Sequence, residues 1–275
     1  MQSLKSGPGP SEPGDEQPSA PAQDQQRNPQ NAADLRTRAQ IPPGPALYIV
    51  ATPIGNLEDV TLRALRILEQ VDTILSEDTR KTGILLKHYG LSTRQKSYRV
   101  HNEDRDLETA LSFLREGRNL AFCSDAGTPG ISDPGSRLVR AMRDTMPDAP
   151  IFTIPGPSAL VAALSISGWQ AHPSVFGGFL SPKPGRRRKF LNARADSDDL
   201  IVLYESVHRI EGLLRDIRTI FPDRFIQVAR ELTKIYEEVV IFSPDFSDLQ
   251  WEEALKALSR KGEFTVIIGP RRESF

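Results

Sequence analysis

From residue 47 onwards, short apolar runs alternate with longer stretches in which apolar side chains recur at helical spacing. The first four runs have the length and composition of buried strands and occupy residues 47–51, 73–76, 120–124 and 151–154. The clearest helical stretch follows Asp104 and ends at Gly117, with one apolar face formed by Leu107, Ala110, Leu111 and Leu114. Alternation of this kind predicts a mostly parallel sheet that helices cover on both faces.

A second helix is expected to begin at Asp133 and Pro134, which suit an N-cap and a first turn, and to bury Leu138, Val139 and Met142. Beyond residue 168 the pattern starts again, with apolar runs at 175–180, 200–204, 225–229, 239–242 and 264–268. One helical stripe follows the second of these runs, formed by Ile210, Leu213, Leu214, Ile217 and Phe221. We therefore predict two α/β domains, residues 46–168 and 169–275.

The first 45 residues are rich in Pro, Gly, Ser, Gln and Asn and almost lack large apolar side chains. Such a segment buries too little surface to offset the entropy of ordering, so we predict a disordered tail. The chain carries 35 Lys and Arg against 36 Asp and Glu, and removing the four basic and five acidic residues of the tail leaves 31 of each. A neutral folded part has to contact RNA through local basic patches and shape rather than through overall charge.

Several classes of protein are disfavoured. No apolar run approaches the roughly 18 residues of a membrane helix, which predicts a cytoplasmic protein without a membrane partner. The single cysteine, Cys123, lies in an apolar run and is expected in a strand core. The four histidines are scattered, so no metal site is expected.

Three loops of Gly, Pro and small residues follow the first, third and fourth apolar runs, at residues 52–56, 125–135 and 155–159. The carboxyl ends of parallel strands lie at one edge of a sheet, where ligands collect in open α/β folds. Each loop alone is better explained by ordinary turns, which favour Gly and Pro. Together they predict a cradle for a small ligand, and the missing phosphate-loop and Gly-x-Gly-x-x-Gly patterns disfavour ATP and NAD.

Polar clusters at residues 77–81, 101–103, 204–209 and 230–234 begin where strand-like runs end, or would reach the same edge. We expect them to line a polar cleft, although helix caps and surface ion pairs are the alternative for each. The basic run at residues 185–189 is expected to contact an RNA backbone, the alternative being a solvated charged face.

The apolar runs, loops and polar clusters together resemble the family of small-subunit ribosomal RNA methyltransferases in the tetrapyrrole methylase superfamily. The resemblance covers about residues 46–270 and is carried by 47–57, 77–80, 124–129, 132–135, 155–159, 230–234 and 237–238. It implies two α/β domains with S-adenosylmethionine in the cleft between them, and a homodimer. It also implies methyl transfer to the ribose 2′-oxygen of a cytidine in the decoding region of 16S ribosomal RNA, within the small ribosomal subunit.

The resemblance further implies which residues hold the cofactor: Pro53, Gly55, Ser124, Asp125, Ala126, Gly127, Thr128, Ile131, Pro155, Gly156, Ser158, Ala159, Val207 and Thr233. Val207 stands where the family typically has Pro, and it can donate a backbone N–H that Pro cannot. This difference affects the local contact rather than the activity.

Methyl transfer to a hydroxyl depends first on positioning and gains from a general base. Their location at strand ends makes four carboxylates candidates for that base: Glu77, Asp78, Glu103 and Glu231. Candidates for substrate binding are Arg80, Lys81, Asn102, Arg186, Arg187, Arg188, Lys189, Arg209, Arg230 and Lys234. Two alternatives remain open, a methylase that acts on a corrin or porphyrin carbon and a non-catalytic RNA-binding assembly factor.

Overall fold

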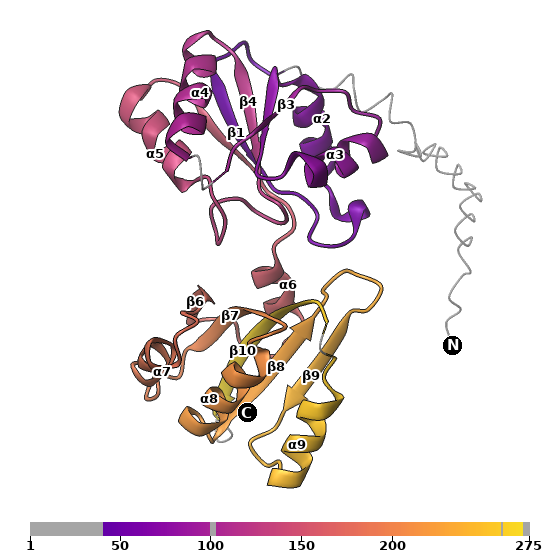
Figure 1. Ribbon diagram of the computed structural model, residues 1–275, viewed down its shortest axis with the longest axis vertical. Helices are drawn as coiled ribbons and strands as arrows, with labels where there is room; N and C mark the ends of the chain where they lie inside the picture. Colours follow the sequence, from indigo (N-terminus) through magenta and orange to yellow (C-terminus); the bar gives the residue numbers. More distant parts are fainter. Residues whose placement is uncertain (1–40, 100–102, 260, 272–275) are drawn as a thin grey trace, which may run out of the picture. The chain divides into compact units, whose positions relative to one another are not determined.

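The first sheet contains five parallel strands and is built from the N-terminal part of the computed structural model, which describes residues 41–99, 103–259 and 261–271. The strands are β1 (Ala46–Val50), β2 (Thr73–Ser76), β3 (Gln95–Ser97), β4 (Asn119–Cys123) and β5 (Ile151–Ile154). They lie in the order β3-β2-β4-β1-β5, so the carboxyl ends of all five point to one edge (Figure 1).

Helices cover both faces of this sheet, as the alternation of apolar runs and helical stretches predicts. On one face, α2 (Leu62–Gln70) and α3 (Thr79–His88) pack against the side of β1 that carries Tyr48. On the other, α4 (Glu103–Arg115) and α5 (Ser136–Thr145) pack against the side that carries Leu47. Neighbouring strand residues point to opposite faces, which explains why continuous apolar runs form this sheet. Cys123 is buried in β4, in agreement with its predicted place in a strand core.

Three features of this part differ from the sequence-based expectation. The edge strand β3 has no apolar residue and pairs only with β2, so it left no hydrophobic signal. The predicted helix start at Asp133 is wrong, because α5 begins at Ser136 with Gly135 as its N-cap. Residues 41–45, assigned to the tail, are ordered: the N–H of Ile41 donates to Gln70 at 3.0 Å. The rest of the predicted tail, residues 1–40, lies outside the described residues.

The second sheet contains β6 (Ser174–Phe179), β7 (Leu200–Ser206), β8 (Arg224–Arg230), β9 (Glu238–Phe242) and β10 (Glu263–Arg271) in the order β6-β7-β10-β8-β9. Only β6 and β7 are parallel, and the other pairs are antiparallel. The mostly parallel sheet expected from the first four apolar runs is therefore confirmed, whereas the second sheet is mixed. The last strand, β10, inserts between β7 and β8, a non-local pairing without a local signal.

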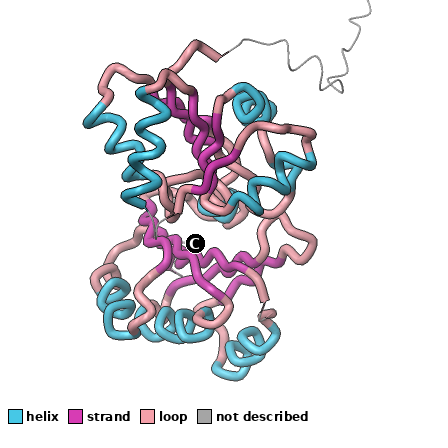
Figure 2. Tube along the Cα trace, turned by 45° about the horizontal axis from the view of Figure 1, so that its top comes forward, coloured by secondary structure: helices cyan, strands magenta, loops and turns pink. Residues whose placement is uncertain are grey.

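The second sheet carries most of its helices on one face (Figure 2). Here α7 (Pro184–Asn192), α8 (Ile210–Ile220) and α9 (Asp248–Ala257) bury their apolar sides, including the whole predicted stripe of α8. On the opposite face, the short α6 (Ala159–Ser165) packs on the sheet through Ala163 against Val202 and Ile267. Because α6 precedes residue 168, the second core begins before the boundary that we predict there, and that boundary stays a prediction.

Candidate functional site

The three Gly- and Pro-rich loops of the first sheet meet, as their position after parallel strands predicts. Thr52 and Gly127 exchange two backbone hydrogen bonds of 2.9 Å, which tie the loop after β1 to the loop after β4. The hydroxyl of Thr128 donates to the carbonyl oxygen of Pro157 at 3.1 Å, which adds the loop after β5. Gly127 has a φ of +75°, a conformation that glycine adopts without strain. The loops therefore form one preorganised rim.

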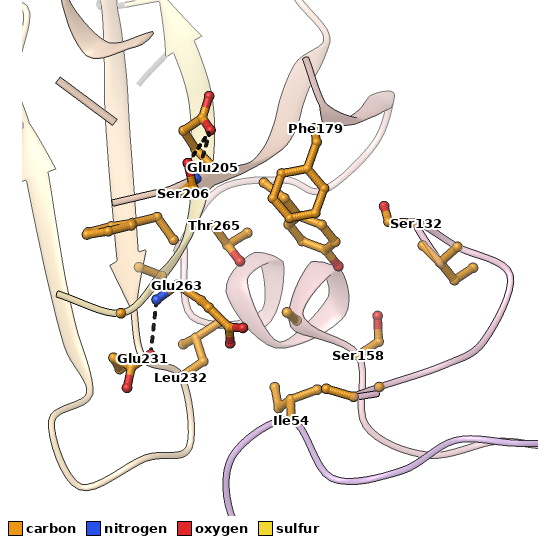
Figure 3. Close-up of a pocket in the computed structure, with 18 of the residues that line it drawn as sticks. Ile54, Ser132, Ser158, Phe179, Glu205, Ser206, Glu231, Leu232, Glu263 and Thr265 are labelled. Carbon is orange, nitrogen blue, oxygen red and sulfur yellow. Dashed lines mark hydrogen bonds between the residues drawn. The ribbon is translucent and has the colours of Figure 1, made fainter. Parts of the chain in front are cut away.

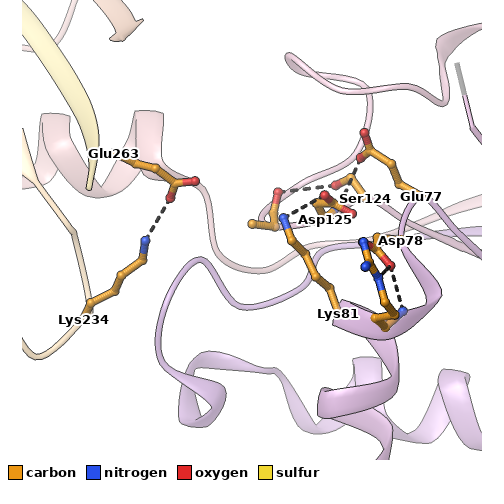
Figure 4. A network of polar contacts seen from close by, with 9 residues as sticks. Glu77, Asp78, Lys81, Ser124, Asp125, Lys234 and Glu263 are labelled. Carbon is orange, nitrogen blue, oxygen red and sulfur yellow. Dashed lines mark hydrogen bonds and ion pairs between the residues drawn. The ribbon is translucent and has the colours of Figure 1, made fainter. Parts of the chain in front are cut away.

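A fourth loop, after β2, joins this rim through side chains (Figure 4). The carboxylate of Glu77 accepts a hydrogen bond from the backbone N–H of Asp125 at 3.2 Å. The ammonium group of Lys81, in the first turn of α3, lies 2.8 Å from Oδ2 of Asp125. Burial raises the pKa of Glu77, and the carboxylates of Asp125 and Asp133 raise it further, whereas the N–H of Asp125 and Lys81 offset part of that rise.

The main cavity, of about 340 Å³, opens beside these loops and is lined by both sheets (Figure 3). The first-sheet loops contribute Ile54, Ala126, Gly127, Thr128, Ile131, Ser132, Asp133, Ser158 and Ala159. The second sheet and its loops contribute Phe179, Tyr204, Glu205, Ser206, Val207, Ala229, Glu231, Leu232, Lys234, Gly262, Glu263, Phe264 and Thr265. Its volume is within the range of small-molecule sites, and apolar walls alternate with carboxylates.

A second hollow, of about 230 Å³, adjoins the main cavity and shares Ile54, Ala126, Lys234 and Glu263 with it. Its other lining residues are Thr52, Pro53, Gly55, Leu57, Lys81, Thr82, Ile84, Leu85, Ser124 and Asp125. Two lysines, Lys81 and Lys234, thus line the second hollow, and Lys234 lines the main cavity as well.

Eleven of the residues expected to hold a cofactor line one of the two hollows. Those in the main cavity are Ala126, Gly127, Thr128, Ile131, Ser158, Ala159 and Val207, and those in the second hollow are Pro53, Gly55, Ser124 and Asp125, with Ala126 shared. Pro155, Gly156 and Thr233 line neither hollow. A Cβ on Gly156 would come within 3.0 Å of the Ala51 side chain.

The four carboxylates suggested as general bases occupy different environments. Glu231 lines the main cavity, whereas Glu77 stands behind Asp125. Asp78 is the N-cap of α3 and its carboxylate binds the guanidinium of Arg80, which strongly lowers the pKa of Asp78. Asp78 therefore matches the alternative interpretation of its polar cluster, a helix cap with a surface ion pair. Glu103 begins α4, and its side chain, like Asn102, lies outside the described part.

Glu231 and Lys234 form a network with Glu263 beside the cavities, of which Figure 4 shows the ion pair between Lys234 and Glu263. The ammonium group of Lys234 lies 2.7 Å from Oε1 of Glu231 and 2.9 Å from Oε2 of Glu263. Burial raises the pKa of Glu231, but hydrogen bonds from Lys234 and the N–H of Glu263 outweigh it and leave the pKa lowered. Glu231 and Thr233 have positive φ angles of 50° and 67°, a strained conformation that concentrates at functional sites.

Three arginines expected to bind substrate are engaged inside the protein. Arg187 is buried and binds Asp216, with side chains 8% and 7% exposed, so it is withdrawn from the predicted surface run. Arg209 donates to Glu205 at 2.9 Å and to the carbonyl of Leu180. Arg230 binds Glu238 at 2.9 Å and is only 10% exposed. Inward-facing guanidinium groups need carboxylate partners because burying an unpaired charge is costly.

The remaining basic candidates lie on the surface or at the cavities. Arg186 and Lys189 are exposed on α7, and Arg188 is exposed apart from its bond to Asp216 at 2.8 Å. Arg80 and Lys81 are exposed in the first turn of α3. The basic run is thus split by the helical period, with Arg187 facing the core.

Thirteen residues that line the main cavity were not among the individual site residues expected from the sequence: Ile54, Ser132, Asp133, Phe179, Tyr204, Glu205, Ser206, Ala229, Leu232, Gly262, Glu263, Phe264 and Thr265. Ile54, Asp133 and Leu232 belong to the motifs that carry the resemblance, so the signal was present, but Asp133 was interpreted as a helix cap. Burial raises the pKa of Asp133, the Ser124 hydroxyl lowers it in part, and the Asp125 carboxylate raises it. Glu263 and Thr265 reach the cavity only because β10 inserts beside β7.

Within the described residues, no group of three or more His, Cys, Asp and Glu side chains is arranged to hold a metal ion. In the same part of the chain, every helix is too short or too polar to cross a bilayer.

Comparison with known proteins gives the class to which this fold and cavity belong. The chain belongs to the family of tetrapyrrole (corrin/porphyrin) methylases, whose sequence model matches residues 46–244. That range includes all three rim loops and nearly every described lining residue.

Within this family the chain falls in the group named ribosomal RNA small subunit methyltransferase I. It is 41% identical over 228 residues to the protein of that name from Leptospira biflexa, covering 83% of this chain and 92% of the relative. It is 47% identical to the one from Synechocystis, covering 81% and 78%. It is 43% identical to the one from Escherichia coli O157:H7, covering 81% and 77%.

Solved structures share the fold at lower identity. The methyltransferase CobJ superposes with a TM-score of 0.60 at 20% identity, covering 82% of this chain and 94% of that chain. Uroporphyrin-III C-methyltransferase from Thermus thermophilus, in complex with S-adenosylhomocysteine, superposes with a TM-score of 0.57 at 18% identity, covering 84% and 100%. The predicted α/β fold of the tetrapyrrole methylase type is confirmed.

Proposed function

We propose that this protein transfers a methyl group from S-adenosylmethionine to small-subunit ribosomal RNA, and that the acceptor is the ribose 2′-hydroxyl of a cytidine in the decoding region of 16S RNA. The observation that carries the proposal is the cavity itself, enclosed by the loops of the first sheet and the exposed end of the second. Relatives at 38–47% identity that carry a ribosomal RNA methyltransferase name support the RNA substrate.

The lining residues fit S-adenosylmethionine in chemistry as well as in size. The ligand carries a cationic sulfonium, an ammonium group and an adenine ring, and the cavity offers the carboxylates of Asp133, Glu231 and Glu263 beside the apolar surfaces of Ile54 and Leu232. Oδ1 of Asp125, a residue that lines the second hollow, is buried and has no hydrogen-bond partner among the described residues. Buried polar atoms of this kind gain a partner when a polar ligand binds.

When bound, S-adenosylmethionine supplies an activated methyl group, so the protein has to hold the acceptor oxygen in line with it and to remove one proton. The three rim loops, which hydrogen bonds join, hold the acceptor oxygen in place, because a preorganised site keeps bound reactants close to the geometry of the reaction. We propose Asp133 as the proton acceptor. It lines the main cavity, and its raised pKa makes it a better base than an exposed carboxylate.

Glu77 has a positioning role in this proposal. Its carboxylate holds the N–H of Asp125, and the opposite end of Asp125 is held by Lys81, so both ends of that residue are fixed. Lys81 and Lys234 line the second hollow, each paired there with a carboxylate, and in this proposal they contact the phosphates on either side of the acceptor nucleotide when RNA binds.

We further propose that the enzyme acts in the cytoplasm on the small ribosomal subunit, and as a homodimer. The edge strand β9 supports a dimer, since its side chains Val239 and Ile241 and the neighbouring Tyr236 are apolar and exposed. Sedimentation analysis of the full chain tests the oligomeric state, and a monomer at all concentrations would exclude this part of the proposal.

The central experiment supplies labelled S-adenosylmethionine with unmodified small ribosomal subunits, and maps the label by nuclease digestion. Uroporphyrinogen III and precorrin substrates are offered in parallel. A 2′-O-methylcytidine product is expected. Label on the tetrapyrrole alone would replace the proposal by the corrin or porphyrin alternative, and tight RNA binding without label would replace it by the assembly factor.

A further inference from the structure

Phe179, at the end of β6, exposes an aromatic ring at the mouth of the main cavity (Figure 3). Its side chain is 59% exposed although it lines that cavity. It also lines an adjoining hollow of about 340 Å³ together with Ile131, Phe176 and Gly178. An isolated exposed apolar residue needs no explanation, but an aromatic ring at the rim of a ligand cavity offers a stacking surface.

A β-bulge directs the ring to this place. The register of β6 against β7 shifts between Phe176 and Gly178, so that Phe176 pairs with Val202 and Phe179 pairs with Tyr204. Residues three apart in a regular strand point to opposite faces, whereas the extra residue brings both phenylalanines to the same face. Bulges beside active sites re-aim side chains in this way.

The neighbouring side chains hold the bulge and the ring in place. The ring of Phe176 lies 5.0 Å and the ring of Phe179 5.5 Å from the ring of Tyr204, both in edge-to-face geometry. The hydroxyl of Tyr204 accepts a hydrogen bond from the N–H of Leu160 at 3.0 Å, which fixes the central ring. Gly178 has a φ of +56°, and a Cβ there would lie 3.1 Å from the hydroxyl of Ser132. A side chain at Gly178 would therefore both strain the bulge and push it from the rim.

We propose that Phe179 is the platform on which the base of the acceptor nucleotide stacks, which rests on the RNA substrate of the proposed function. An enzyme that modifies a ribose inside folded RNA has to reach a nucleotide whose base is stacked, and an aromatic surface at the cavity mouth compensates for extruding it. The hollow beside Phe179 is lined by Ile131, Ser132 and the backbone of Gly177 and Gly178. This neutral lining suits a planar uncharged base rather than a phosphate.

The position of the lysines agrees with this assignment. Lys81 and Lys234 stand at the second hollow, and Phe179 stands at the hollow that it shares with Ile131, both continuous with the main cavity. A nucleotide has a charged backbone and a neutral base, and the lysines and the exposed aromatic ring likewise lie at different hollows.

The test uses Phe179→Trp in the full chain as a fluorescent reporter, because a base stacked on an indole quenches its emission. Signals from the two natural tryptophans are removed by titrating the wild-type protein in parallel. The probes are an eight-residue oligocytidylate RNA, the same RNA with abasic sites, and S-adenosylhomocysteine. Quenching by the intact oligonucleotide but not by the abasic one is expected.

Affinity and turnover give an independent measurement. Phe179→Ala is expected to raise the KM for unmodified small subunits about 5- to 150-fold, the range that loss of one base–aromatic stack produces, with the KM for S-adenosylmethionine unchanged. Phe179→Leu, which keeps apolar area without an aromatic face, should behave like Phe179→Ala, and Phe179→Tyr should restore the wild-type value. Leu249→Ala removes an apolar side chain that is 69% exposed on α9 and serves as the matched control.

Three results would overturn the assignment. Quenching of Phe179→Trp by S-adenosylhomocysteine alone would place the ring against the cofactor instead. Equal quenching by intact and abasic RNA, or wild-type kinetics in Phe179→Leu, would show that no base stacks on Phe179. These outcomes are separate from failure of the proposed function, which would appear as absence of methyl transfer to subunits by the wild-type enzyme.

Discussion

The carboxylate of Glu77, after β2, accepts a hydrogen bond of 3.2 Å from the backbone N–H of Asp125, after β4. Two loops that are 48 residues apart in sequence are thereby joined behind the second hollow. Glu77 is half-buried among other carboxylates, and burial is the main reason for its raised pKa.

Glu77→Gln is expected to keep the hydrogen bond, since the amide oxygen still accepts from Asp125, and to leave single-turnover methylation within about tenfold of wild type. Glu77→Ala should lower it by about 100-fold, because a misplaced loop costs turnover. Rapid-quench methylation of small subunits measures both. Equal effects of the two variants would show that the charge, and not the hydrogen bond, matters.

Glu77→Gln is also expected to have a pH-dependent effect on stability. Because the pKa of Glu77 is higher in the folded than in the unfolded chain, stability is lost as the pH rises from the unfolded pKa through the folded pKa. Below the unfolded pKa, near 4.5, both states hold the proton and this cost is absent. Glu77→Gln should therefore raise the melting temperature at pH 7 relative to wild type, with the difference shrinking towards pH 4. A constant difference between pH 4 and 8 would contradict the raised pKa.

Asp133→Asn tests the proposed proton acceptor. The single-turnover rate is expected to fall about 10²- to 10⁴-fold, because the amide cannot take the proton from the ribose hydroxyl. The wild-type rate should fall as the pH drops through the pKa of Asp133, which burial raises above the usual value for Asp. Calorimetry should show that the variant still binds S-adenosylhomocysteine. Asp148→Asn, at an exposed position after α5, is the control.

Arg187 and Arg186 are neighbours that face opposite environments. Arg187→Ala leaves the buried carboxylate of Asp216 with Arg188 alone, and should cost about 3 kcal/mol in the free energy of unfolding. Arg186→Ala, at an exposed position, should change it by less than about 0.5 kcal/mol. Urea denaturation measures both values. Similar values for the two variants would contradict the inward orientation of Arg187.

Gly55 lies where the loop after β1 touches the loop between β8 and β9. A Cβ there would lie 2.3 Å from Cγ of Lys234 and 3.0 Å from the carbonyl oxygen of Leu232, and the backbone atom cannot yield as a side chain does. Gly55→Ala should shift residues that line both hollows and lower turnover about 10- to 100-fold.

Gly185→Ala is the matched control, since a Cβ at that position meets no described atom within 4 Å. Its turnover should equal that of wild type. If Gly55→Ala were equally active, the close approach of the two loops would have no part in forming the site.

Cys123 should act as a probe of unfolding. Its thiol is fully buried in β4, and burial raises its pKa to about 12, so almost no thiolate is present at neutral pH. The folded protein is expected to resist thiol reagents at pH 8, and mass spectrometry should detect labelling only as urea unfolds the chain. Rapid labelling without urea would show that β4 opens locally.

Much of the fold could be predicted from local patterns. The strands of the first sheet that carry apolar runs were placed within one residue, and the stripe from Ile210 to Phe221 identified α8. The strand β3 could not be found, because Gln95–Ser97 is polar and is a strand only through its pairing with β2. The strand directions of the mixed second sheet could not be predicted either, since they depend on where β10 inserts.

The candidate site divides in the same way. Loops rich in Gly and Pro after parallel strands identified the rim, and hydrogen bonds between Thr52, Gly127, Thr128 and Pro157 join them as expected. The roles of charged residues were much harder to predict. Arg209 and Arg230 resemble substrate ligands in sequence but bind Glu205 and Glu238, and Asp133 resembles a helix cap but lines the cavity.

The sequence by itself determined the alternation of strands and helices, the loops at the carboxyl ends of the first sheet and the resemblance to a methyltransferase family, because these depend on side-chain patterns within a few residues. Only the tertiary structure decided which charged groups face inward and how Phe179 reaches the cavity mouth. Burial and partners depend on contacts between distant segments, so an arginine in a basic run and a phenylalanine at a strand end acquire their roles only after the chain has folded.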